Sequence, residues 1–332
     1  MTTQTVPDFA SFKIGFDLRD KPKVFSYWED IFASQKWSEA KYTELFEQKW
    51  GAWNGLPSVA TSSWAGGAVI ALEYFKVKGR KVLVPTNTFM ATALAVRKAG
   101  GEVVFGDCSR EDLCLSLAAV EKAAAEHDLA AVFLVHIGGH IAFDTPKIAE
   151  FCKKKGIVLI EDCAHAHGAA WDGKRPGQWG QAGVWSFFAT KSVSTGEGGM
   201  LVSSDKGLIE YAKKYRNYGK FDYVVSGLNF RMSEFTAALG VVQTDRMDEI
   251  VAWKNEVAKT HLDPKHPQRL KLPAGMSSGY YKYIVFSPLE KSTGKVYDQL
   301  CHKIMGKPGE FPNAEWVAQN HWCVPLYYNP AF

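Results

Sequence analysis

The chain has 332 residues, of which 46% are hydrophobic, and its 39 basic and 35 acidic residues give a formal net charge of +4. This length allows a sizeable core and favours one large domain with a smaller companion. The basic excess forms no long block, so we expect no nucleic-acid partner. The six cysteines include no C-x-x-C pair, and the sequence has neither a leader-like N-terminus nor a run of about 18 apolar residues. We therefore expect reduced thiols, no membrane contact and a cytoplasmic protein.

Short apolar runs alternate with helix-length amphipathic segments through the first two thirds of the chain. The expected strands are 81–85, 102–107, 130–136, 157–162, 183–188 and 200–203, and the expected helices are 65–75, 90–99, 117–127, 146–155 and 206–215. This alternation is typical of an α/β fold with a mostly parallel central sheet flanked by helices. Ligands of such sheets bind at the carboxyl ends of the strands.

The pattern becomes helical from about residue 229 and continues to a polar, proline-containing break at 263–275. Beyond the break, we expect a strand over 280–286 and a helix over 295–304. We place the domain boundary here. The prediction is a large cofactor-binding domain over 1–260 and a small C-terminal α+β domain over 261–332, on which the N-terminal segment packs.

Two residues near the middle of the sequence carry the strongest chemical signal. Asp162 closes the apolar run at 157–162, and Lys191 stands where an aromatic run breaks into a glycine-rich turn. An apolar setting lowers the pKa of a lysine and so frees its amine to condense with an aldehyde. A carboxylate on a neighbouring strand end can hold a proton on a pyridine nitrogen. The pair therefore indicates a pyridoxal 5'-phosphate (PLP) site.

Both residues also have alternative interpretations. Most lysines are solvated surface charges, and an aspartate that closes a buried strand often caps the next turn. Asp162, His165 and His167 also form a D-x-x-H-x-H pattern of possible metal ligands. A metal would leave Lys191, the aromatic run and the glycine-rich turn without a role, so we favour the cofactor and expect no metal site.

Two further segments are placed for a phosphate and for a flat ring. Residues 59–67 lead into an expected helix, whose free N–H groups and dipole attract anions. The alternative is a serine-rich helix cap that binds nothing. Phe89 follows the next expected strand, where it either stacks on a heterocycle or fills the core.

These segments together resemble the DegT/DnrJ/EryC1/StrS family of sugar aminotransferases, which are fold-type-I PLP enzymes. The matching segments, in order between about residues 28 and 247, are PTNTFMAT (85–92), GDC (106–108), VHIGGH (135–140), EDCAHAHGA (161–169), WSFFATKSVSTGEGG (185–199), RNYGK (216–220) and LNFRMSEFTAALGVVQ (228–243). Several ordered motifs at family-like spacing are more specific than any one of them.

The resemblance implies a role for each matching residue. Lys191 is the Schiff-base lysine, Asp162 is the partner of the pyridinium nitrogen, and His165 is a third catalytic residue near the phenolic oxygen of the cofactor. The remaining cofactor contacts are implied for Phe89, which stacks on the ring, for Ser63, Trp64, Ala65 and Ser186 at the phosphate, and for Asn229 from the second subunit of a homodimer.

The resemblance also implies an activity, with two alternatives left open. The expected enzyme moves an amino group from an amino acid, with glutamate as the expected donor, to a keto sugar that is expected to be nucleotide-linked. PLP would cycle through pyridoxamine phosphate in this amino-sugar biosynthesis. The alternatives are a keto-sugar dehydratase on the same fold and a non-catalytic regulatory or binding protein. Dehydratases of this type carry a histidine where Lys191 stands, which favours amino transfer.

The sequence departs from the family pattern in two places. Ser63-Trp64-Ala65 replaces the usual Ser-Gly-Thr type of turn, which removes a hydroxyl, is expected to put an indole near the phosphate and leaves more of the anion binding to backbone amides. The C-terminal third is short between its YYKYIVF and AEWVAQNHWCVPLYY segments, and no closing helix is expected after them. Both departures motivate the regulatory alternative.

Overall fold

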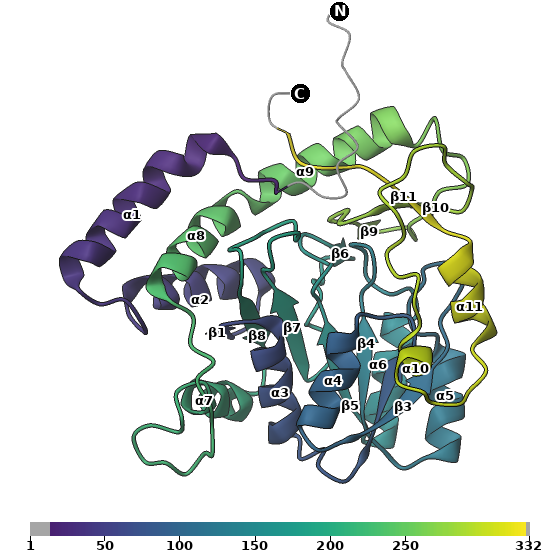
Figure 1. Ribbon diagram of the computed structural model, residues 1–332, viewed down its shortest axis with the longest axis horizontal. Coiled ribbons are helices and arrows are strands. Elements are labelled where there is room, and N and C mark those ends of the chain that lie inside the picture. Colours follow the sequence, from purple (N-terminus) through teal and green to yellow (C-terminus); the bar gives the residue numbers. More distant parts are fainter. Residues whose placement is uncertain (1–13, 330–332) are drawn as a thin grey trace, which may run out of the picture.

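The computed structural model describes residues 14–329, and its centre is a seven-stranded sheet (Figure 1). In spatial order the strands are β1 (Ser58–Thr61), β8 (Gly199–Val202), β7 (Ala182–Ser186), β5 (Val158–Asp162), β4 (Leu129–Val135), β2 (Lys81–Pro85) and β3 (Glu102–Gly106). Strand β8 pairs antiparallel with β1 and β7, and the other pairs are parallel. Six strands therefore end at one edge of the sheet, and the predicted α/β fold is confirmed.

Helices cover both faces of the sheet because successive strand residues point to opposite sides. Val184 and Leu201 face one side, where they pack with α3, α4 and α7. Leu159 faces the other side and packs with α5 and α6, and Trp185 packs on that side with α2 and α8. The bounds of these helices are α2 (Lys41–Asn54), α3 (Trp64–Tyr74), α4 (Met90–Lys98), α5 (Leu117–Glu126), α6 (Thr145–Lys155), α7 (Lys206–Tyr215) and α8 (Glu234–Asp245).

The predicted elements between residues 65 and 215 are all present, with small shifts at their ends. Helix α8 begins later than the expected residue 229, because the side chain of Ser233 caps it by accepting from the backbone N–H of Thr236. The sequence did not predict α1 (Lys21–Ser34) or α2. The indole of Trp28 on α1 donates to the backbone oxygen of Phe235 at 3.1 Å, which helps to hold α1 on α8.

The C-terminal third corrects one prediction. Of the expected helix over 295–304, only α10 (Cys301–Ile304) forms. The backbone N–H of Cys301 instead donates to Thr86 at 2.7 Å, and that of Val296 donates to the ring of His321 at 2.8 Å. These tertiary contacts hold residues 295–300 in an irregular path and override their helical pattern.

Four short strands and two further helices complete the described chain. Strand β6 (Ala170–Trp171) pairs with β9 (Met276–Ser277), and β10 (Tyr283–Val285) pairs with β11 (Trp322–Val324). Helix α9 (Met247–Val257) continues into a π-helical turn (Ala258–Leu262). The other helix is α11 (Pro312–Gln319). Figure 1 shows α9, β10 and β11 above the sheet. Strand β10 lies within the predicted strand over 280–286 but is shorter.

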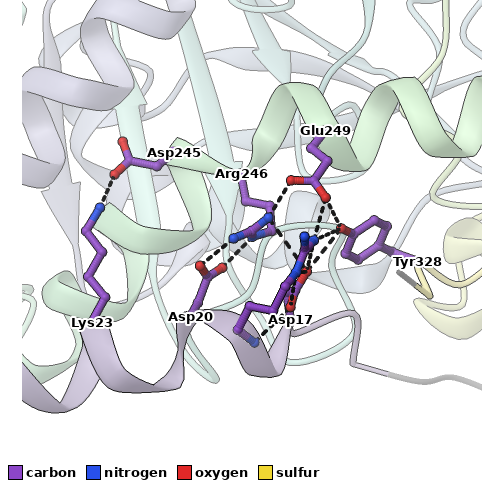
Figure 2. Close-up of polar contacts among 8 residues, drawn as sticks. Asp17, Asp20, Lys23, Asp245, Arg246, Glu249 and Tyr328 are labelled. Carbon is purple, nitrogen blue, oxygen red and sulfur yellow. Dashed lines mark hydrogen bonds and ion pairs between the residues drawn. The ribbon is translucent and has the colours of Figure 1, made fainter. Parts of the chain in front are cut away.

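An ion-pair network joins the beginning and the end of the described chain to α9 (Figure 2). Arg19 contacts Asp17 and Glu249, each at 2.6 Å, and Arg246 contacts Asp20 at 2.5 Å. The hydroxyl of Tyr328 donates to Glu249 at 2.9 Å. Within residues 14–329, no helix has both the length and the apolar character needed to cross a lipid bilayer.

Candidate active site

A cavity of about 660 Å³ lies where the parallel strands end. Eight of the nine predicted site residues line it: Ser63, Trp64, Ala65, Phe89, Asp162, His165, Ser186 and Lys191. Asp162 and Ser186 are the last residues of β5 and β7, and Ser63 caps α3. The sheet therefore brings together residues that are more than a hundred positions apart in the sequence.

Asp162 is held in place by three donors. Its Oδ1 accepts from the backbone N–H of Ala164 and from the indole Nε1 of Trp64, both at 3.0 Å, and its Oδ2 accepts from the hydroxyl of Thr92 at 3.3 Å. Both lone pairs of Oδ1 are thus used, whereas Oδ2 keeps one lone pair for another donor. The side chain is only 5% exposed. Burial raises the pKa of Asp162, and the N–H of Ala164 and the charge of Lys191 oppose that rise.

The indole of Trp64 points inward to Asp162, whereas the sequence led us to expect it near the phosphate. Trp64 is 7% exposed, and its ring packs against Phe133 with 6.0 Å between the ring centroids. Its only polar hydrogen reaches Asp162. The substitution in the Ser63-Trp64-Ala65 turn therefore acts on the carboxylate at the end of β5.

Lys191 lies in the loop after β7, with its ammonium 4.7 Å from the ring centroid of Tyr281. The pKa of Lys191 is lowered to about 8, mainly by burial and in smaller part by the charge of Lys282, while the charge of Asp162 opposes the decrease. A substantial fraction of the side chain is therefore a neutral amine just above neutral pH. A neutral amine is the form that attacks a carbonyl group.

His165 is a buried, neutral histidine between two tyrosines. Its ring stacks on Tyr281 with 4.1 Å between centroids, and its Nε2 lies 3.4 Å from the hydroxyl of Tyr297. The backbone N–H of Gly138 donates to Nδ1 at 3.4 Å, which leaves Nε2 to carry the proton. Burial, reinforced by the charges of Lys191 and Lys282, keeps the pKa of His165 well below its ordinary value.

The start of α3 opens into the cavity. The hydroxyl of Ser63 caps the helix by accepting from the backbone N–H of Gly66 at 3.3 Å. The first N–H groups of the helix, on Trp64 and Ala65, have no partner within the helix and are available to an anion. The hydroxyl of Ser186 lies at the same cavity. Phe89 is 67% exposed, so the face of its ring is open to a ligand.

Two predicted features do not meet at this cavity. Asn229 is exposed and does not line it, so its predicted role requires a second copy of the chain. His167 points away from His165 and packs against Trp50 and Trp185. Among residues 14–329, the groups whose ligand atoms come close enough to share a metal are Asp112, Cys114 and His140, and His136, Glu161 and Cys163. The D-x-x-H-x-H alternative is therefore not supported.

Sequence reasoning missed the second wall of the cavity. Tyr281 and Tyr297 line it, followed along the chain by Asp298 and Gln299. The hydroxyls of Tyr281 and Thr190 lie 3.1 Å apart, which connects this wall to the loop that carries Lys191. The aromatic cluster at 280–283 is the sequence signal for this wall, but its pattern predicts only a strand.

The residues present fit PLP. Oδ2 of Asp162 keeps a lone pair for a pyridinium N–H, the Lys191 ammonium has no hydrogen-bond acceptor among the described residues, and helix N–H groups are free at Trp64 and Ala65. The cavity is also of the size that holds a whole small ligand, about 300–1,000 Å³. Fold and cavity together define an α/β protein with a lysine and a carboxylate placed for PLP chemistry.

Comparisons with known proteins agree with this class. Residues 19–300 match the DegT/DnrJ/EryC1/StrS aminotransferase family. A GDP-perosamine synthase of Escherichia coli O157:H7 is 32% identical over 67% of this chain, a match that spans 62% of that relative's length. A pleiotropic regulatory protein of Geobacillus stearothermophilus is 28% identical over 92% of this chain and 90% of its own. The crystal structure of an aminotransferase from Streptoalloteichus hindustanus has a TM-score of 0.88 and 27% identity, and the alignment covers 97% of this chain and 94% of that one.

Because the family match covers most of its length, the chain belongs to the DegT/DnrJ/EryC1/StrS aminotransferase family.

Proposed function

We propose that the protein is a PLP-dependent aminotransferase that moves an amino group from an amino acid to a nucleotide-linked keto sugar. The observation that carries the proposal is the convergence of Lys191, with its lowered pKa, and Asp162 on one cavity of ligand size. The sequence similarity to the GDP-perosamine synthase of Escherichia coli O157:H7 supports the choice of acceptor. Glutamate as the donor, a homodimer completed by Asn229, a cytoplasmic location and the division at residues 260 and 261 are parts of the same proposal.

The proposed cofactor site uses the cavity residues in distinct roles. The N–H groups of Trp64 and Ala65, with the hydroxyls of Ser63 and Ser186, hold the phosphate. Phe89 would contact the pyridine ring of the cofactor, and His165 would contact its phenolic oxygen. When bound, PLP supplies a pyridinium ring that accepts the electron pair left after a proton leaves the donor's α-carbon.

Asp162 acts through its one free lone pair. Trp64, Ala164 and Thr92 fix the carboxylate, so that Oδ2 faces the cavity as an acceptor. A cation opposite this oxygen lowers the pKa of Asp162 and thus reverses the effect of burial. The carboxylate then stays ionised and keeps the proton on the pyridine nitrogen.

Lys191 acts first as an anchor and then as a base. Lys191 would hold PLP through the aldehyde group of the cofactor, with loss of one water molecule, and its amine would become free once the donor's amino group has taken that place. In the cofactor-free protein the pKa of this amine is about 8, close to the pH at which an efficient general base works. From this position the amine would take a proton from the donor's α-carbon and hold it until it is returned.

The two alternatives are weaker. Lys191 stands where the keto-sugar dehydratases of this fold carry a histidine, which argues against dehydration. A regulatory role is favoured by the likeness to the Geobacillus protein and by the Trp64 turn, although Trp64 supports Asp162 and leaves the cavity intact.

The test is to incubate the PLP-loaded protein with glutamate and to measure 2-oxoglutarate. An aminotransferase yields up to one equivalent per subunit without an acceptor and more when a nucleotide-linked keto sugar is added. A protein that binds PLP and yields no 2-oxoglutarate from glutamate would exclude glutamate as the donor. No keto acid from a panel of amino acids would reject the proposal.

A further inference from the structure

A second, smaller cavity lies beside Lys191. Its volume is about 130 Å³, and it shares Thr190, Lys191 and Tyr281 with the main cavity. Lys254 and Lys282 also line it. Three of its ten described lining residues are thus lysines, and none of the ten is acidic. The roles proposed above use Lys191 alone and leave the other two cations unexplained.

Lys254 is a buried lysine whose hydrogen-bond partners among the described residues are uncharged. It is 5% exposed, and its ammonium donates to the hydroxyl of Ser192 at 3.0 Å and to the backbone oxygen of Tyr280 at 3.1 Å. No carboxylate pairs with it within residues 14–329. An ammonium has three N–H donors, so one of them remains for a further acceptor. A buried charge that lacks a partner is costly, and an anion in the cavity would offset that cost.

Lys282 adds a second charge at the same place. Its ammonium lies 5.4 Å from the ring centroid of Tyr281, the ring that Lys191 also approaches. Burial, with a smaller contribution from the charge of Lys282, lowers the pKa of Lys254 to about 7. The charge of Lys282 also lowers the pKa of Lys191. Lys282 is therefore close enough to each of the other two lysines to oppose its charge, which favours an anion at this place.

The acidic groups behind this cavity already have partners. Tyr328 lines the cavity, but its hydroxyl lies within hydrogen-bond distance of Asp17, at 3.2 Å, and of Glu249, at 2.9 Å (Figure 2). Both carboxylates also pair with Arg19. The hydrogen bond from Arg19 is the main reason why the pKa of Asp17 is lowered to about 2. These carboxylates therefore belong to the network that fixes the chain ends and do not neutralise the lysines.

We propose that the small cavity binds the side-chain carboxylate of a dicarboxylic amino-acid donor, with Lys254 and Lys282 as its anchors. This inference rests on the proposed aminotransferase function. A donor whose amino group takes the place of Lys191 on the cofactor lies next to the small cavity, because Thr190, Lys191 and Tyr281 line both cavities. A volume of about 130 Å³ equals roughly four water molecules. It suits a carboxylate and its methylene groups, whereas a nucleotide-linked sugar needs the larger cavity.

The test measures binding of glutarate, a dicarboxylate that has no amino group and cannot react. Isothermal titration calorimetry of the PLP-loaded protein should show saturable glutarate binding. Lys282→Gln should weaken it at least about tenfold, because a charge-assisted hydrogen bond is lost. Lys282→Arg should keep the affinity within about twofold, since the charge remains. Lys153→Gln, which removes an exposed charge on α6, is the matched control and should change nothing.

A second variant and a second ligand keep the outcome clear. Lys254→Met should also weaken glutarate binding, and its melting temperature shows whether the fold survives. Binding of GDP, a probe for the acceptor, should be unchanged in both lysine variants. Unchanged glutarate affinity in Lys282→Gln, a loss of GDP affinity instead, or no glutarate binding to the parent protein would overturn the proposal. Failure to form 2-oxoglutarate from glutamate is a separate result, which counts against the proposed function.

Discussion

The main cavity has two walls of different origin. One wall consists of residues at or just after strand ends, such as Phe89, Asp162 and Ser186, and the cap of α3. The other consists of Tyr281 and Tyr297, from irregular segments near the C-terminus. The first wall carries the groups that we propose for cofactor chemistry, and we propose that the second contacts the substrate. The contrast suggests that the sheet fixes the reaction and the C-terminal segments select the substrate.

The largest expected effect is on the strand-end wall, at Lys191. Lys191→Ala removes both the anchor and the base, so turnover should fall by at least about a thousandfold. Circular dichroism and the melting temperature should stay close to those of the parent, because the ammonium has no hydrogen-bond partner among the described residues to lose. Substantial amino transfer by this variant would contradict the assignment of Lys191.

Asp162→Asn should produce the next largest loss. A neutral amide cannot hold a proton on the pyridine nitrogen by charge, so the rate of proton abstraction should fall on the order of a hundredfold. Cofactor affinity should fall less, since the phosphate contacts are untouched. Stopped-flow absorbance with glutamate measures the rate, and equilibrium dialysis measures the affinity. An unchanged rate would remove Asp162 from the mechanism.

Trp64→Phe tests whether the unusual turn supports Asp162. The variant removes the donor to Oδ1, so the ionised carboxylate loses one of its hydrogen bonds and the proton-abstraction rate should fall about tenfold. The pH at which the bound cofactor changes its absorption spectrum should also shift. Trp316→Phe, on α11 and outside the cavity, is the control. Equal behaviour of the two variants would show that the indole only fills space.

The pH dependence of PLP capture by the apoprotein tests whether the cavity lowers the pKa of Lys191. With its pKa at about 8, the neutral fraction of the amine should rise about tenfold between pH 7 and pH 9 and then level off. The rate of PLP capture by the apoprotein should follow this curve. A lysine with the ordinary pKa would give a rate that still rises steeply beyond pH 9, and that result would show that the cavity does not lower its pKa.

Tyr297→Phe probes the other wall and should have the smallest effect. It removes one hydroxyl contact to His165, worth about 1 kcal/mol, so a change of about fivefold is expected. We expect this change to affect the KM for the sugar acceptor. The rate of the glutamate half-reaction should stay nearly the same. Tyr74→Phe, which loses a hydroxyl contact to Asp205, the N-cap residue of α7, is the control. A selective loss of the glutamate half-reaction would contradict the division between the two walls.

The sequence was sufficient for the first wall because local rules place its residues. Apolar runs separated by amphipathic segments predicted the strands from 81 to 203, and Asp162 follows from its position at a strand end. Once the sheet is parallel, its strand ends must meet at one edge. Eight of the predicted site residues consequently line one cavity.

The second wall could not be predicted in the same way. Residues 295–304 have a helical pattern, but contacts with Thr86 and His321 keep most of them irregular and bring Tyr297 into the cavity. These contacts connect positions far apart in the sequence, which no local pattern reports. The inward orientation of the Trp64 indole could not be predicted for the same reason, because its partner Asp162 lies 98 residues away.

The central claim is that Lys191 forms the covalent link to PLP. The most direct measurement is to load the protein with PLP, reduce it with borohydride and map the modified peptide by mass spectrometry. The account predicts one pyridoxyl group per chain, located on Lys191. Modification confined to Lys254 or Lys282, or no modification of any lysine, would contradict it.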